Sequence, residues 1–299
     1  ALAVLVVAIV AFVQTNRAST KQDYQLALNS LTQLGQSYVD QLATDIPRAR
    51  LRVDFSWDRY EVATYNDLYR GDAAILPFNP VDDEELKAVE ANERKVAEEV
   101  AEAERQFEQA MSAIDDERAM SVYVEFQKMR QEVYGEGRDV SQYVESTIHT
   151  GRMSFACADF MSDDPQAFYI PTVDKAKRFA IYAEGCLAAL NGARDSGVLT
   201  PDQQEFMEVM GDMFGEAVEV VNSRIAQNRV EVTMLDGVFE KYGQRINSLD
   251  TGDPDRPTIS DLNSQLRQLR PLLVEKQGQA PGKISSDSVP GGIPRSGGG

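Results

Sequence analysis

The chain has 299 residues, 42% of them hydrophobic, which is enough for one large domain or two smaller ones with a buried core. It carries 30 Lys and Arg against 48 Asp and Glu, and this net charge of −18 argues against a nucleic-acid partner, because phosphate binding needs a basic surface. One His and two Cys are too few ligands for a structural zinc site or a c-type haem, so we expect no metal and no cofactor.

The chain begins with thirteen apolar, uncharged residues, Ala1 to Val13. As a helix this run is about 20 Å long, whereas the hydrocarbon layer of a bilayer is about 30 Å thick. Because residue 1 lies inside the run, we expect residues 1–17 to be the end of a single-pass transmembrane helix that starts further upstream. The core of a signal peptide and a buried helix are the alternatives. The acidity of the remaining chain and its two cysteines favour an extracytoplasmic, periplasmic location for it.

Residues 18–80 are predicted to form a stalk helix followed by an irregular connector. Apolar residues at spacings of three and four predict an amphipathic helix that Pro47 ends or bends. These residues are Tyr24, Leu28, Leu31, Leu34, Tyr38, Leu42 and Ile46.

The connector is the most site-like part of the sequence, because aromatic and arginine side chains are enriched where proteins bind partners. A subdomain that caps the bundle is the simpler interpretation of the same residues. The candidates for binding a ligand or a partner are Trp57, Arg59, Tyr60, Tyr65 and Tyr69.

Residues 81–276 are predicted to form an acidic helical bundle, so the fold class is all-α, with long coiled-coil-like helices. Asn79 and Pro80 mark a helix start, and the apolar repeat that follows is interrupted where Glu93 takes an apolar position. This helix either reaches Tyr134 or breaks near Asp115. Residues 82–136 hold 17 acidic and 7 basic residues, which we interpret as a solvated face; a docking surface for a basic partner or divalent cations is the alternative.

Clear boundary signals define the later helices. We expect the helix that follows Thr200 to include the core stripe Met207, Met210, Met213 and Phe214, and to extend beyond Ile225 as far as about Leu249. Pro271 is expected to bend or shorten the last helix. The boundary signals are the glycines at 135 and 137 and the capping residues Thr172, Thr200 and Thr258.

Two residue pairs on these helices invite a structural interpretation. Cys157 and Cys186 lie on consecutive helices that a turn makes antiparallel, so a disulfide is expected in an oxidising compartment, with two buried thiols as the alternative. Glu145 and His149 are four residues apart, and we expect them to pair on one helical face.

Residues 277–299 are predicted to be a flexible tail, because Gly, Ser and Pro make up 14 of the 23 residues. The sequence contains no nucleophile elbow, phosphate-binding loop or dinucleotide-binding glycine motif, so we expect no enzyme activity.

The sequence therefore favours a scaffolding subunit of an envelope complex. We expect it to contact the membrane through its N-terminal helix, and other subunits or itself by helix pairing. A ligand-sensing ectodomain that resembles the helical bundles of bacterial chemoreceptors is the alternative.

Overall fold

The computed structural model describes residues 2–43, 84–157, 170–249 and 256–279. Within these ranges the protein is all-α, as the apolar periodicity predicts, and no strand is present. The elements are α1 (Leu2–Ser37), the π-helical turn η1 (Tyr38–Leu42), α3 (Glu84–Ser112), α4 (Glu117–Tyr134), α5 (Val140–Ala156), α7 (Val173–Arg194), α8 (Pro201–Ala226), α9 (Asp236–Asn247) and α10 (Ile259–Gln279).

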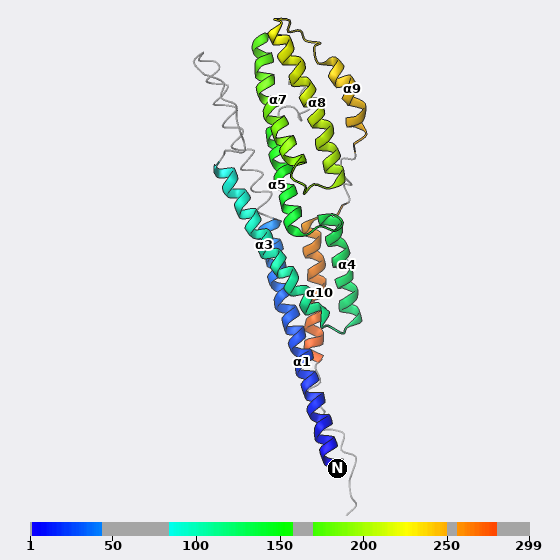
Figure 1. Ribbon diagram of the computed structural model, residues 1–299. Coiled ribbons are helices and arrows are strands. Elements are labelled where there is room, and N and C mark those ends of the chain that lie inside the picture. The colour runs from blue at the N-terminus through cyan, green and yellow to red at the C-terminus, as the bar shows by residue number, and fades with distance from the viewer. Residues whose placement is uncertain (1, 44–83, 158–169, 250–255, 280–299) are drawn as a thin grey trace, which may run out of the picture.

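The helices form two bundles that lie end to end (Figure 1). The lower bundle consists of α1, η1, α3, α4 and α10, and the upper bundle consists of α7, α8 and α9. Helix α5 belongs to both, because Val140 and Val144 lie in the lower core while Met153 and Cys157 lie in the upper core. It therefore connects the two bundles.

Helix α1 packs against α3 and α10 and gives the lower core one continuous stripe of buried side chains. The last part of this stripe, Leu34, Tyr38 and Leu42, is spaced by four residues, and four residues of α-helix overshoot a full turn by about 40°. The chain corrects this drift with a wider π-helical turn, in which the Ala43 N–H bonds to the Tyr38 carbonyl at 3.0 Å. All three side chains consequently remain in the core.

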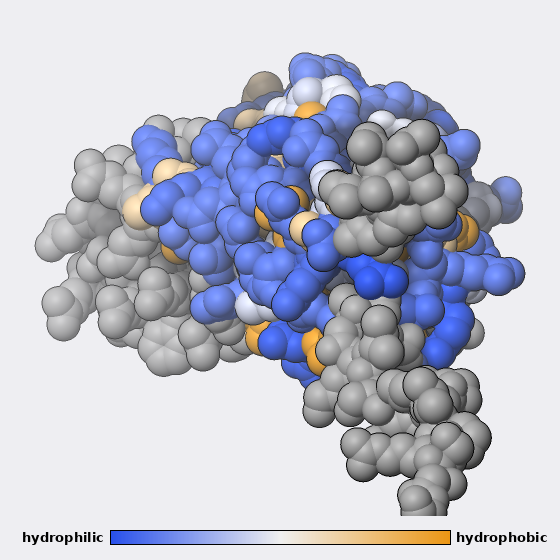
Figure 2. All heavy atoms as spheres, turned by 90° about the horizontal axis from the view of Figure 1, so that it is seen from below, coloured by the Kyte–Doolittle hydropathy of each residue, from blue (hydrophilic) through white to orange (hydrophobic). Residues whose placement is uncertain are grey.

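The first part of α1 extends beyond the other labelled helices (Figure 1). Every described side chain from Ala11 to Gln22 is exposed, and Tyr24 is the first that is buried. Viewed from this end, the described surface is mainly hydrophilic with scattered hydrophobic residues (Figure 2). Among the described helices, we find none with an apolar stretch of the length that crossing a membrane requires.

The acidic segment forms two helices, because the chain turns between Ser112 and Glu117. Asp116 stabilises this turn: its carboxylate accepts a hydrogen bond from the Ala119 N–H at 2.9 Å and binds Lys276 of α10 at 2.9 Å. Of the two alternatives from the sequence, a break near residue 115 is therefore the right one.

The boundary signals are confirmed at Thr172, Thr200 and Thr258, and two expected extents were wrong. Thr172 and Thr200 accept a backbone N–H in the first turn of α7 and of α8, and Thr258 exchanges hydrogen bonds with Asp261. Helix α8 ends at Ala226 and does not continue to residue 249, because the chain turns there with Asn228 in the left-handed region at φ 50°.

The last helix is longer than expected. It passes through Pro271, whose missing N–H leaves the Arg267 carbonyl without a helical partner on the exposed side of the helix. It continues to Gln279, so residues 277–279 of the predicted tail are helical.

Cys157, at the end of α5, forms a disulfide with Cys186 of α7, and both residues are buried in the upper core. The bond closes a loop with a sequence separation of 29. Such a cross-link restricts the unfolded chain and so favours the folded state.

Reduction of this disulfide is expected to lower the free energy of unfolding of the upper bundle by about 2–4 kcal/mol. Urea unfolding followed by circular dichroism, with and without reductant, measures the effect. The double variant Cys157→Ala, Cys186→Ala is the control, and its unfolding midpoint should not respond to reductant. Equal midpoints for the untreated and the reduced wild type would contradict the prediction.

Candidate functional site

The binding residues expected from the sequence, Trp57, Arg59, Tyr60, Tyr65 and Tyr69, lie outside the described residues. The expected disulfide between the two cysteines is present. The described polar side chains gather instead around α1 and α3 in the lower bundle.

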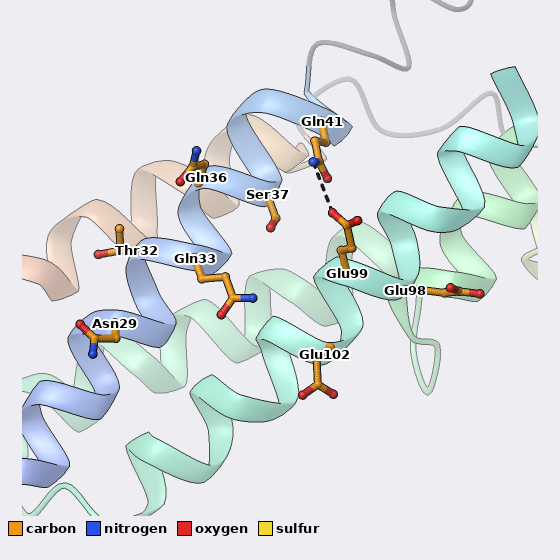
Figure 3. A pocket seen from close by; sticks show the side chains of 9 residues that line it. All are labelled: Asn29, Thr32, Gln33, Gln36, Ser37, Gln41, Glu98, Glu99 and Glu102. Atoms are coloured by element: carbon orange, nitrogen blue, oxygen red, sulfur yellow. Dashed lines mark hydrogen bonds between the residues drawn. The ribbon is translucent and has the colours of Figure 1, made fainter.

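A groove with a volume of about 700 Å³ runs between α1 and α3 (Figure 3). Its α1 side carries uncharged polar residues, and Figure 3 shows Gln33 and Ser37 pointing toward α3. Its other side carries carboxylates, and Gln41 Nε2 donates a hydrogen bond across the groove to Glu99 Oε2 at 3.4 Å. The lining residues are Asn29, Thr32, Gln33, Gln36, Ser37, Gln41, Glu98, Glu99 and Glu102.

This groove offers hydrogen bonds and negative charge. Amides and hydroxyls donate and accept, and the three carboxylates of α3 make the wall acidic. Such a surface suits a contact with a polar or basic group of a partner.

A cluster of buried polar side chains joins η1, α3 and α4. Glu104 of α3 is only 5% exposed, and its Oε1 accepts hydrogen bonds from the hydroxyl of Tyr38 and, at 2.8 Å, from that of Tyr134. Arg130 of α4 lies 3.4 Å from Glu104 Oε2 and 2.8 Å from Glu108. The π-helical turn therefore begins at a residue whose hydroxyl is fixed by a buried carboxylate.

Burial sets the protonation of this cluster. Removal from water raises the pKa of the Glu104 carboxyl, and the bonds from Tyr38 and Tyr134 and the charge of Arg130 offset only part of that effect. Burial, together with the nearby carboxylate, also raises the pKa of Tyr38 well above its ordinary value. Both phenols therefore remain neutral hydrogen-bond donors.

Ion pairs between α3 and α5 form a second cluster. Glu90 of α3 is 3% exposed and binds the Arg152 guanidinium of α5 through both carboxylate oxygens. Arg94 of α3 binds Glu145 of α5 in the same bidentate way. These pairs fix how α5 crosses α3.

The interpretation of the acidic segment as a solvated face was wrong for four of its residues. Glu90, Glu93, Glu104 and Asp116 are all less than a tenth exposed. They tolerate burial where arginines or tyrosines of other helices supply hydrogen bonds, as the two clusters show for Glu90 and Glu104. Glu93 carried a signal in the sequence, because it interrupts the apolar repeat.

The expected pair of Glu145 with His149 is present only as a secondary electrostatic interaction. Glu145 binds Arg94, and this bond lowers the pKa of its carboxyl. Burial and the neighbouring Arg152 lower the pKa of His149, so the ring is neutral at pH 7. Helix α3 supplies a stronger partner for Glu145 than the neutral imidazole.

Within the described ranges, His, Cys, Asp and Glu side chains do not gather in groups of three that would hold a metal ion. Comparison of the chain with protein-family models, with characterised proteins and with solved structures finds no match.

Tyr134→Phe is expected to destabilise the protein by about 1–3 kcal/mol at pH 7, because it leaves a buried carboxylate with one donor fewer. Burial raises the pKa of Glu104 above 4.5 in the folded state. Protonation of Glu104 therefore favours folding at low pH, and this contribution to stability is lost as the pH rises through the folded-state pKa. Tyr134→Phe raises the pKa of Glu104 further. The loss of stability caused by the substitution should therefore be small at pH 4, where Glu104 is protonated, and larger at pH 7.

Urea unfolding at the two pH values measures this difference. Tyr242→Phe is the matched control, because Tyr242 of α9 also donates to a carboxylate, that of Glu216, but both side chains are partly exposed. It should change stability by less than about 0.5 kcal/mol. A loss for Tyr134→Phe that is as small as the control, or larger at pH 4 than at pH 7, would refute the assignment.

Proposed function

We propose that this chain is a non-enzymatic structural subunit of a membrane complex. The apolar end of α1 anchors it as a single-pass protein, and its two helical bundles, which lie outside the cytoplasm, contact neighbouring subunits. The observation that carries the proposal is the composition of α1, which is apolar at one end and a core helix of the lower bundle at the other.

The exposure of Ala11 and Phe12, near the end of the apolar run, supports a partner for this run that is not part of the bundle. Residues 1–13 are apolar, and Phe12 is 66% exposed. An apolar helix of this kind is costly in water, since each large apolar side chain gains about 1.5–3 kcal/mol on burial. Thirteen residues make about 20 Å of helix, so we propose that this end enters the hydrocarbon layer.

The disulfide supports a location outside the cytoplasm, because such bonds persist in oxidising compartments. It lies in the upper bundle, at the opposite end of the molecule from the start of α1 (Figure 1). The chain would then extend away from the membrane with its cross-linked bundle outermost.

Two surfaces favour contact with neighbouring subunits. The exposed part of α1 between residues 14 and 22 is mainly polar and offers hydrogen bonds to a neighbouring chain. The acidic groove between α1 and α3 offers hydrogen bonds and negative charge to a basic segment. The most buried carboxylates, Glu90 and Glu104, already bind arginine or tyrosine, which favours a structural role for them over a catalytic one.

Cell fractionation followed by chemical crosslinking and mass spectrometry tests the proposal. The wild type is expected in the membrane fraction with reproducible crosslinks to the same neighbours. Leu5→Gln, Ile9→Gln, Phe12→Gln in one chain should lower membrane partitioning at least about a hundredfold and remove those crosslinks.

The matched control substitutes three exposed apolar residues of the bundle, Leu26→Gln, Val124→Gln, Val274→Gln, and should behave as the wild type does. A wild-type chain that stays in the aqueous fraction would contradict the anchor. A membrane-bound chain that is a lone monomer would contradict the structural role.

A further inference from the structure

A second groove, with a volume of about 280 Å³, lies between α1 and α10 and differs in charge from the first. Two arginines of α10, Arg267 and Arg270, line it, and no carboxylate does so among the described residues. In a chain with a net charge of −18, a groove lined only by basic and neutral side chains stands out. Its electrostatic field favours an anion.

The side chain of Asn263 lines this groove. Asn263 is 8% exposed, and its side chain makes no hydrogen bond with any residue that the structure describes. Its Oδ1 is 3.7 Å from the position that a Cβ on Gly35 would take, so the glycine of α1 leaves the space around the amide open. Its amide atoms are not among the buried polar atoms that lack a partner, so they reach solvent at the groove, and a ligand there can replace water as their hydrogen-bond partner.

The two arginines are placed to act with this amide. Asn263, Arg267 and Arg270 follow each other at intervals of four and three residues, so they lie on one face of α10. Arg267 forms no ion pair or hydrogen bond within the described structure, and Arg270 donates to the Thr32 hydroxyl of α1 at 3.3 Å. The planar guanidinium group binds carboxylates through two parallel hydrogen bonds.

The remaining lining is partly apolar, because Leu31 of α1 and Leu266 of α10 are buried beneath the polar residues. We infer that the groove binds a small organic carboxylate, with its charged group on the two arginines and Asn263 and its hydrocarbon part on the leucines. The volume restricts the ligand to a small molecule. This site does not depend on the anchor or the structural role proposed above.

Saturation-transfer difference NMR on the full chain, with benzoate as the probe, tests the inference. Benzoate should receive saturation from the wild type, and its affinity should fall about tenfold or more in Arg267→Gln, because one charge-assisted contact is lost. Arg267 is exposed and unpaired within the described structure, so the substitution should leave the unfolding midpoint unchanged. Arg229→Gln, the same change in the exposed turn between α8 and α9, is the matched control and should bind as the wild type does.

Two further probes test the chemistry of the ligand. Benzylamine, which has the same ring and the opposite charge, should not bind, and inorganic phosphate should displace benzoate only weakly because it lacks an apolar part. The inference is overturned if benzoate receives no saturation, if Arg229→Gln weakens binding as much as Arg267→Gln, or if benzylamine binds equally well. Displacement by phosphate as efficient as by unlabelled benzoate itself would overturn the assignment to an organic carboxylate.

Discussion

The lower bundle depends on the burial of one face of α1 between α3 and α10. This stripe runs from Tyr24 to Leu42 and stays on one face because the π-helical turn corrects its drift. The same helix carries the apolar run at its other end, without a break in the backbone between them. The apolar run and the core stripe therefore belong to one continuous helix. The first and last helices of the described chain pack side by side.

Charge pairing inside the molecule determines what the acidic segment can do. Helix α3 buries Glu90 and Glu104 against arginines and tyrosines of α4, α5 and η1, while Glu98, Glu99 and Glu102 remain at the groove. Removing one partner of a buried charge is costly, so these contacts fix the arrangement of the helices more than they add to net stability. Two of these three groove carboxylates form exposed ion pairs within α3, which a basic partner would replace.

Local signals in the sequence predicted the helices, but they did not predict the contacts between distant segments. The capping box at Thr200 and the stripe from Met207 to Phe214 depend on neighbours within a few residues, and the structure has both. Glu145 was expected to bind His149, four residues away, yet its hydrogen-bond partner is Arg94 of α3. How α3 crosses α5 cannot be inferred from a local sequence pattern. The bond of Arg270 to Thr32 joins residues 238 positions apart. The grooves on both sides of α1 arise from such pairings, so the sequence could not predict them.

A carboxylate in the α1–α10 groove would connect the first and last helices, and it would favour the ligand-sensing alternative over a purely structural role.

The central claim, that α1 is a core helix at one end and a membrane contact at the other, is tested most directly by hydrogen–deuterium exchange with and without lipid vesicles. Amides of residues 24–42 should be protected in both conditions, and amides of residues 2–13 should gain protection only with lipid. Rapid exchange throughout 24–42, or equal exchange of 2–13 in the two conditions, would contradict the claim.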